Sequence, residues 1–262
     1  MNYCIEYAVL CNKGIVRAKN QDNFWCMGNF LESENEGLQE PCWGKVETAD
    51  FPAFAIFDGM GGELQGEVAA HLAAHSFHEF YENNPKSDLK VFLSGACSAM
   101  NDAICSYAKS QLFGSTGSTA AILLFGKNDI YICNVGDSRV YQFNNKKLIQ
   151  ISLDHSETNI ASGKPPLTQN LGIPATEFII SPYVAKGLYE IGDKYLICSD
   201  GLTDMVSEGE IAEIMSTHKN LTECTEILLQ KALDYGGRDN ITIIICEIRK
   251  QKRGFNLLRR NN

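Results

Sequence analysis

The sequence lacks several features that would place it in a class at once. No apolar run approaches the ~20 residues that a membrane-spanning helix needs, so we expect no transmembrane segment. No Cys-x-x-Cys pair is present, which argues against a zinc knuckle or a thioredoxin-like site. The absence of Gly-x-Ser-x-Gly and of Gly-Lys-Ser/Thr argues against a serine-hydrolase elbow and a nucleotide-binding P-loop.

Positively charged residues are fewer than negatively charged ones. The 262 residues include 23 lysines and arginines against 32 aspartates and glutamates, which gives a formal net charge of -9. Nucleic-acid phosphates repel such a chain unless it has a local basic patch, so we expect no nucleic-acid partner. The first residues lack the basic start and the apolar run of a secretory signal, and we expect a cytoplasmic protein.

The ten cysteines are placed in a way that argues against disulfides. Cys133, Cys198 and Cys246 each lie inside an apolar, strand-like run, where cysteine behaves as a small hydrophobic residue. Hydrophobic residues make up 44% of the chain and charged residues 21%, as in ordinary soluble globular proteins. No internal repeat or interdomain linker is evident, so we expect one domain over residues 1–248, acting as a monomer.

A basic tail is predicted over residues 249–262. Its cations are Lys250, Lys252, Arg253, Arg259 and Arg260, together with the arginine at its start. Such a tail can contact a membrane surface or an acidic partner. Chain ends of this kind are more often merely frayed, and both interpretations stay open.

The sequence is organised around the stretch from Phe54 to Gly62 and the helix that follows it. Four apolar residues end abruptly at Asp58, and three glycines occur within the next four positions. Apolar residues then recur at helical spacing over residues 63–80, so we expect a buried strand that delivers Asp58 to its open end. The glycines allow a tight turn and the close approach of another group. An Asp-Gly hairpin is the alternative, but a helical pattern follows where a second strand would be needed.

Three more aspartates, Asp137, Asp200 and Asp239, adjoin an apolar strand-like run at a glycine-containing turn, and Asp22 is a fifth candidate. Strand ends in a layered fold can converge, and converging carboxylates repel unless a cation lies between them. Mg²⁺ and Mn²⁺ suit such oxygen ligands, whereas zinc and iron favour the histidine and cysteine ligands that are missing here. Two such ions can clamp a phosphoryl group, and Arg17 can pair with its oxygens. The residues therefore predict metal-dependent phosphoryl chemistry without specifying the ester.

The rest of the chain alternates between strand and helix patterns. Strands are predicted over residues 3–12, 118–125, 129–135, 139–143, 147–151, 195–198 and 241–246, and helices over residues 88–112, 207–215 and 221–235. Three polar segments are predicted to lack regular structure: a loop over 16–24, an exposed loop or hairpin over 31–50, and an irregular loop over 152–176.

Seven short motifs occur in order between residues 17 and 242 of the chain. They are Arg17-x-x-Asn20-Gln21-Asp22, Phe57-Asp58-Gly59-Met60-Gly61-Gly62, Gly117-Ser118-Thr119-Ala120, Val135-Gly136-Asp137-Ser138-Arg139, Asp154-His155-Ser156, Cys198-Ser199-Asp200-Gly201-Leu202 and Gly236-Gly237-x-Asp239-Asn240-Ile241-Thr242. Together they resemble the motifs of the metal-dependent Ser/Thr protein phosphatases of type 2C, in their compact bacterial form.

This resemblance implies an α+β fold, a four-layer α-β-β-α sandwich with two mostly antiparallel sheets flanked by helices. It implies that Asp58 bridges two metal ions, Mg²⁺ or Mn²⁺, and that Asp200 and Asp239 complete the first site. The second site would use the carbonyl of Gly59 with Asp22, directly or through water.

The resemblance also implies a third, weaker metal site at Asp137 with Asp200, and a substrate phosphate held by Arg17. The implied reaction is hydrolysis of phosphoserine and phosphothreonine in proteins, by in-line attack of a hydroxide that bridges two metals, without a phosphoenzyme. The substrates would be phosphoproteins made by a Ser/Thr kinase, which places the protein in signalling.

The chain departs from the family pattern at three places. Met60 stands where animal members carry a histidine thought to protonate the leaving group, and Glu63 stands where bacterial members often have histidine. The segment after Ser156 is shorter than the usual flap, and residues 167–172 match the family only in part. Substrate preference therefore cannot be transferred from relatives.

Two other functions stay open at this point. One is a catalytically silent relative that binds phosphoproteins, although the intact Asp58, Asp200 and Asp239 speak against it. The other is a two-metal hydrolase of small phosphoesters or nucleic acid. A metal site on His71, His75 and His78, at helical spacing, is less expected than a polar or partly buried helix face. We expect a structural role for His155, the histidine of the fifth motif.

Overall fold

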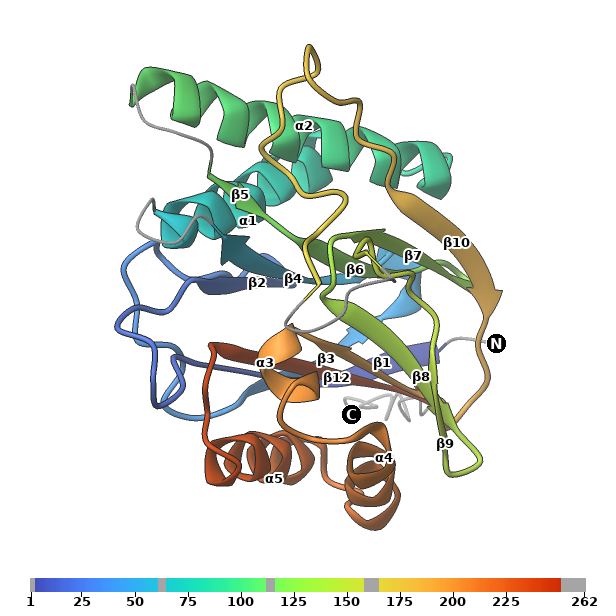
Figure 1. The fold of residues 1–262 in the computed structure, drawn as a ribbon. Helices are drawn as coiled ribbons and strands as arrows, with labels where there is room; N and C mark the ends of the chain where they lie inside the picture. The colour runs from blue at the N-terminus through green and yellow to red at the C-terminus, as the bar shows by residue number, and fades with distance from the viewer. Residues whose placement is uncertain (1–2, 61–64, 112–115, 158–164, 251–262) are drawn as a thin grey trace, which may run out of the picture.

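The computed structural model describes residues 3–60, 65–111, 116–157 and 165–250. Two six-stranded sheets pack face to face, with helices on the outer side of each (Figure 1). Every strand pair in these described ranges is antiparallel. The predicted α+β fold of four α-β-β-α layers is confirmed.

The strands of the first sheet lie in the order β3 (Cys42–Glu47), β1 (Tyr3–Asn12), β12 (Ile241–Lys250), β11 (Lys194–Cys198), β8 (Arg139–Asn144) and β9 (Lys147–Gln150). Those of the second sheet lie in the order β10 (Tyr183–Leu188), β7 (Asp129–Val135), β6 (Ala120–Phe125), β4 (Ala53–Met60) and β2 (Asp22–Cys26), and β5 (Gly117–Ser118) pairs with β4. The first and last strands of the described chain, β1 and β12, are neighbours at the centre of the first sheet.

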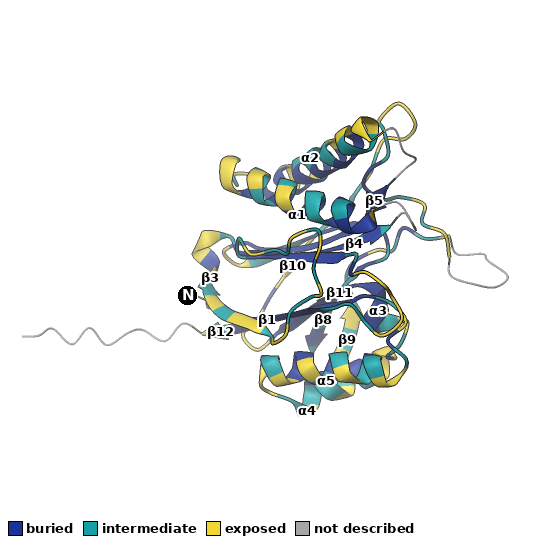
Figure 2. Ribbon diagram, turned by 90° about the vertical axis from the view of Figure 1, so that its left-hand side faces the viewer, coloured by how far each residue is buried: buried dark blue, intermediate teal, exposed yellow. Residues whose placement is uncertain are grey.

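Helices cover both outer faces of the sandwich (Figure 2). The second sheet is covered by α1 (Gly66–Asn83) and α2 (Leu89–Ser110), and the first by α4 (Glu208–Thr217) and α5 (Leu221–Asp234). The short α3 (Asp200–Thr203) follows β11, and a 3-10 turn, η1 (Thr48–Asp50), follows β3. Among the described residues, no helix has the length and apolarity needed to cross a bilayer.

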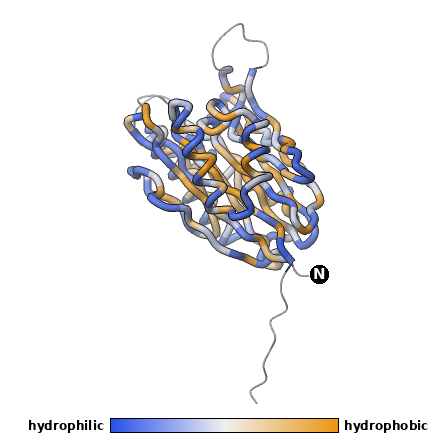
Figure 3. Tube along the Cα trace, turned by 90° about the horizontal axis from the view of Figure 1, so that it is seen from below, coloured by the Kyte–Doolittle hydropathy of each residue, from blue (hydrophilic) through white to orange (hydrophobic). Residues whose placement is uncertain are grey.

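The apolar runs of the central strands are continuous because these strands are buried on both faces. In β4, Phe54 and Ile56 face the other sheet, while Ala55 and Phe57 pack toward α1 and α2. Alternate residues of a strand point to opposite faces, so one strand contributes to two layers of core. Figure 3 shows hydrophobic segments concentrated inside the molecule and hydrophilic ones around its periphery.

Helix starts follow the local sequence. The Asp88 side chain accepts hydrogen bonds from the backbone amides of Lys90 and Val91 and so caps α2. Ser207 and Glu210 form a reciprocal capping box at the start of α4. The observed bounds of α2, α4 and α5 lie within a few residues of the predicted ones. The helix predicted over 63–80 is observed as Gly66–Asn83, with its expected start partly outside the described residues.

The predicted loops contain more regular structure than expected. The prediction of a loop over residues 16–24 is wrong at its end, because β2 begins at Asp22 and pairs with β4. The segment over 31–50 contains β3, and β10 was not predicted at all. Arg249 and Lys250, which were assigned to the basic tail, are the last residues of β12. All ten cysteines are free thiols.

Candidate functional site

The end of β4 is held against the start of β2. Asp58 and Asp22 are directly opposite each other in the register of these two strands. The amide of Gly59 donates to the carbonyl of Gln21 at 2.9 Å. Thr119 fixes the same end of β4, because its amide donates to the Asp58 carbonyl at 2.8 Å and its hydroxyl accepts from the Asp58 amide at 3.0 Å. Two of the predicted aspartates therefore lie at one end of the second sheet.

Asp22 connects this end of the second sheet to the first sheet. Its Oδ2 accepts hydrogen bonds from the hydroxyl of Ser199 at 2.7 Å and from the hydroxyl of Thr242 at 2.6 Å. Ser199 follows β11 and immediately precedes Asp200, and Thr242 is near the start of β12. Asp22 and Asp200 are 2% and 4% exposed. The carboxylate of Asp22 thus joins three strands, and Asp200 lies at the same end of the sandwich.

Asn240 joins the segment around Arg17 to the start of β12. Its Oδ1 accepts from the amide of Gln21 at 2.8 Å, and its Nδ2 donates to the carbonyls of Lys13 and Lys19 at 2.8 and 2.9 Å. An amide side chain can both accept and donate, so this one residue closes the loop over 13–19. The adjacent Asp239 is thereby brought to the same end as Asp22.

Arg17 and Asp239 form an ion pair in this region. The Nη2 of Arg17 lies 2.7 Å from the Oδ2 of Asp239, and their side chains are 48% and 28% exposed. The hydrogen bond with Asp239 is the main cause that raises the pKa of the Arg17 guanidinium, and the charges of Asp58 and Asp22 add to it. Arg17 therefore lies in the combined field of three of the predicted carboxylates.

The two Asp-Gly pairs, one near the end of β4 and one at the start of α3, need glycine for the same reason. A Cβ on Gly59 would lie 2.0 Å from the carbonyl oxygen of Gly66, and a Cβ on Gly201 would lie 2.0 Å from that of Asn240. At both places a backbone carbonyl oxygen occupies the space that a Cβ would need, so no other residue fits without a shift of the chain. The close approach predicted for the glycine after Asp58 is confirmed, and the hairpin alternative is wrong because α1 follows.

Asp137 lies on the turn after β7, beside the same network. Its neighbour Ser138 has its hydroxyl 2.7 Å from that of Thr119, the residue that fixes the end of β4. Gly136 has a φ of +98°, and a Cβ there would lie 2.6 Å from a methyl carbon of Thr119. The turn is thus packed directly against the residue that holds Asp58.

His155 supports this turn from the other side. Its Nδ1 accepts a hydrogen bond from the amide of Gly136 at 3.2 Å, and its own amide donates to the Gly136 carbonyl at 2.9 Å. Burial lowers the pKa of the imidazole, which favours the neutral form that can accept. These contacts agree with the structural role expected for it.

The donor set fits hard cations in its chemistry. The predicted ligand side chains at the gathered strand ends are carboxylates, and backbone carbonyls lie beside them; Mg²⁺ and Mn²⁺ prefer both kinds of ligand. Within the described residues, however, no group of three or more His, Cys, Asp or Glu side chains is arranged to hold a metal ion. One oxygen of Asp22 and one of Asp239 are engaged with hydroxyls and with Arg17. The strand ends are together, but these side chains have protein partners.

The three histidines of α1 surround an aromatic ring. Phe30 has its ring centroid 5.9, 6.0 and 5.7 Å from those of His71, His75 and His78. The Nδ1 of His71 donates to the carbonyl of Leu31, and Trp25 donates to the Nδ1 of His78. This is the partly buried helix face that the spacing predicted as the alternative to a metal site.

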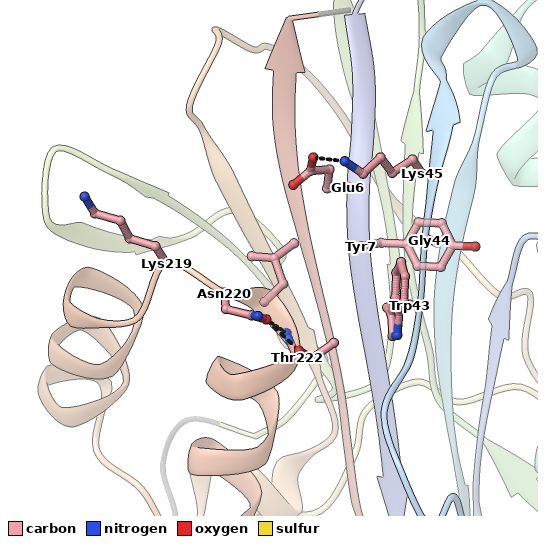
Figure 4. Close-up of a pocket in the computed structure, with 9 residues that line it drawn as sticks. Glu6, Tyr7, Trp43, Gly44, Lys45, Lys219, Asn220 and Thr222 are labelled. Carbon is pink, nitrogen blue, oxygen red and sulfur yellow. Dashed lines mark hydrogen bonds and ion pairs between the residues drawn. The ribbon is translucent and has the colours of Figure 1, made fainter.

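One hollow lies near these residues, and another lies away from them. One of about 260 Å³ borders the loop after Arg17 and is lined by Ala18, Lys19, Asn20, Ser33, Glu34, Asn35, Glu36 and Glu67. The other, of about 550 Å³, lies between β1, β3 and the start of α5 (Figure 4). Its wall includes the exposed Trp43 and a Lys45–Glu6 ion pair of 2.6 Å, and it contains none of the predicted site residues.

Sequence reasoning gave no role to four residues that organise the site. They are Thr119, Ser199, Asn240 and Thr242. Each belongs to a quoted motif, and Ser199 and Asn240 directly adjoin a predicted ligand. A hydroxyl or amide side chain next to an aspartate at a strand end is the signal that could have identified them.

The chain matches known proteins over most of its length. Residues 38–234 match the family model described as Protein phosphatase 2C. The chain is 27% identical over 259 residues to the serine/threonine phosphatase stp of Listeria welshimeri, covering 93% of this chain and 96% of that protein. It is 28% identical to the serine/threonine protein phosphatase PstP of Mycobacterium tuberculosis, covering 93% of this chain and 45% of that protein.

The fold matches a solved structure of a relative as well. The crystal structure of the catalytic domain of PstP in complex with two manganese ions superposes with a TM-score of 0.76, at 27% identity, covering 95% of this chain and 100% of that chain. Sequence match, fold and the order of the aspartate turns agree. The chain therefore belongs to the protein phosphatase 2C family.

Proposed function

We propose that this chain is a Mg²⁺- or Mn²⁺-dependent phosphatase that hydrolyses phosphoserine and phosphothreonine in proteins. The observation that carries the proposal is the hydrogen-bonded gathering of aspartate-bearing strand ends beside the Arg17–Asp239 ion pair. Membership of the protein phosphatase 2C family and the manganese-bound relative support the same activity. The family match alone does not include Arg17, Asp22 or Asp239, so the hydrogen-bond network is needed to relate them to the rest.

Oxygen ligands for the metal ions would come from the gathered turns. In this proposal Asp58 serves two ions, Asp200 and Asp239 complete the first site, and Asp22 and the carbonyl of Gly59 serve the second. When bound, two such ions lower the pKa of a coordinated water and neutralise charge on the phosphoryl oxygens. A third, weaker ion would rest on Asp137 with Asp200.

Arg17 would bind the substrate phosphate through its planar guanidinium, which can donate two parallel hydrogen bonds to phosphate oxygens. Half-exposed ion pairs such as Arg17–Asp239 contribute little stability and exchange easily. A phosphate can therefore replace Asp239 on the guanidinium, which frees the Oδ2 of Asp239 for a metal ion. Substrate and metal would then both favour the same rearrangement.

The proton for the leaving alkoxide must come from a group other than the side chain of residue 60. Met60 ends β4, and its thioether carries no acidic proton. Any acid therefore has to come from elsewhere in the site. This separates the chain from relatives that carry a histidine at this place.

The proposed substrates are phosphoproteins made by a Ser/Thr kinase, hydrolysed in the cytoplasm by a monomer. The net charge of -9 supports a protein substrate over a polynucleotide. We propose that residues 1–248 form the catalytic domain and residues 249–262 a separate basic tail, with the first two residues of that tail continuing β12.

The full chain tests this proposal directly. Turnover of p-nitrophenyl phosphate and of a phosphothreonine peptide is measured with and without Mn²⁺, and we expect both to depend on the ion. No turnover at any Mn²⁺ concentration would instead support a silent phosphoprotein-binding module. Hydrolysis of nucleotides without hydrolysis of phosphopeptides would support a hydrolase of small phosphoesters.

A further inference from the structure

Two large aliphatic side chains are exposed immediately before Arg17. Ile15 and Val16 are 65% and 66% exposed, although β-branched aliphatic residues are usually buried. A single exposed hydrophobic residue is ordinary and needs no explanation. Here two are adjacent in sequence and next to the residue that we assign to the substrate phosphate.

The backbone that carries this pair is firmly held. The amides of Ile15 and Val16 donate to the carbonyl of Gly237 at 2.8 and 3.3 Å. Gly14 has a φ of +79°, and a Cβ there would lie 2.2 Å from the carbonyl oxygen of Asp239. The side chain of Asn12 accepts from the Gly14 amide at 2.8 Å. The exposure of the pair therefore reflects a fixed backbone that presents both side chains to solvent.

The same contacts place the pair beside the candidate site. Gly237 and Asp239 belong to the turn that precedes β12, and Arg17 pairs with Asp239. Successive residues of an extended peptide are about 3.3 Å apart along its length. When a phosphorylated residue has its phosphate on Arg17, its neighbours in the substrate chain must pass within a few residue lengths of Ile15 and Val16.

We propose that the Ile15–Val16 pair is a docking surface for an apolar side chain next to the phosphorylated serine or threonine of a protein substrate. Contact between aliphatic side chains removes apolar surface from water and needs no directional hydrogen bond. It therefore selects for apolar character and size rather than for one sequence. The inference rests on the proposed function, because it assigns the phosphate to Arg17.

The test uses phosphothreonine peptides that differ only in the residues before and after the phosphothreonine, which are leucine in one peptide and serine in the other. With Mn²⁺, we expect kcat/KM of the unaltered chain to favour the leucine peptide about tenfold, mainly through KM, because each tenfold step needs only a modest binding difference. In the double variant Ile15→Ser, Val16→Ser this preference should fall to about twofold or less, below the gain expected from one buried aliphatic group.

The matched control is Val91→Ser. Val91 lies in α2 and is 68% exposed, slightly more than Val16, but it is on a helix that covers the other sheet. This variant should keep the leucine preference. If the double variant has also lost turnover of p-nitrophenyl phosphate, Val16→Thr decides, since it preserves shape while adding a hydroxyl, and we expect it to reduce the preference about threefold.

An unaltered chain without a leucine preference would overturn the inference, and so would a Val16→Thr or double variant that retains it in full. Loss of the preference in Val91→Ser would also overturn it, because the effect would then not belong to this surface. Failure of the proposed function looks different: the unaltered chain would hydrolyse neither peptide nor p-nitrophenyl phosphate at any Mn²⁺ concentration.

Discussion

Asp22 and Asp239 lie at the same end of the sandwich but are held in different ways. Asp22 is 2% exposed, and its Oδ2 accepts from two buried hydroxyls that belong to the opposite sheet. Asp239 has a side chain that is 28% exposed and pairs with the half-exposed Arg17. One carboxylate is part of the connection between the sheets, while the other has a partner that solvent or ligand can replace.

We therefore expect loss of Asp22 to lower stability, and loss of Asp239 to lower activity with little effect on stability. Removal of Asp22 takes away the charged acceptor of two buried hydroxyls. Ser199 then has the Asn240 carbonyl at 3.5 Å and Thr242 has the Cys11 sulfur at 3.2 Å, which are weaker acceptors. Loss of the Arg17–Asp239 ion pair should change the free energy of unfolding little, because exposed ion pairs contribute roughly 0–1 kcal/mol. Four substitutions test the comparison, from the largest expected effect to the smallest.

Asp22→Ala should damage both properties. We expect the free energy of unfolding to fall by about 3 kcal/mol, since hydrogen bonds to a charged group contribute about 1.5–3 kcal/mol each, and Mn²⁺-dependent turnover should fall as well. Urea unfolding and phosphopeptide kinetics measure the two effects. A variant of unchanged stability would show that Asp22 does not hold the sheets together.

Asp239→Asn should abolish activity while leaving the fold intact. We expect Mn²⁺-dependent kcat/KM to fall at least a hundredfold, because even partners outside the metal's own ligands cost about 10–100-fold. Unfolding free energy should change by less than about 0.5 kcal/mol.

The matched control for this variant is Asp234→Asn, at the exposed end of α5. It should leave both measurements as they were. Mn²⁺ should raise the melting temperature of the unaltered chain and of the control, since a ligand of the folded state stabilises it, but much less that of Asp239→Asn. Near-normal turnover in Asp239→Asn would remove this residue from the metal site.

Ser199→Ala tests the connection from its donor side. The hydroxyl donates to Asp22 and accepts from the amide of Thr242, and the residue is fully buried. We expect a loss of about 2 kcal/mol in unfolding free energy, because one hydrogen bond to a charged acceptor is removed. Thr203→Ala on α3 serves as the control, because the hydroxyl of Thr203 donates to the Asp200 carbonyl of its own helix. Equal losses in the two variants would argue against a special role for the Asp22 contact.

Arg17→Ala should give the smallest effect. We expect KM for phosphopeptides to rise about tenfold, equivalent to about 1.4 kcal/mol, with a smaller change in kcat and in stability. Steady-state kinetics resolve the two parameters, and Lys90→Ala, an exposed cation on α2, is the control. Unchanged kinetics would exclude Arg17 from the phosphate site.

Much of the fold was predictable where local signals agree. Strand β1 and strand β7 have the predicted bounds, and α2 begins one residue after the predicted start at residue 88. The strands that were missed, β2, β3 and β10, are edge strands of their sheets; β3 and β10 are largely half-exposed or exposed, whereas β2 is buried but begins within a polar segment. β3 and β10 contain few buried apolar residues that could form a pattern, because an edge strand has a neighbouring strand on one side only. Their hydrogen bonds to a distant strand stabilise them instead.

The sequence by itself determined that aspartates adjoin apolar strands next to glycines, because a short stretch contains the strand, the carboxylate and the glycine together. It also indicated the cation chemistry that such carboxylates require. Only the tertiary structure decided which of them are buried, and that Ser199 and Thr242, 177 and 220 residues from Asp22, donate to it. No local pattern encodes a contact over that separation, since it exists only once the two sheets have packed.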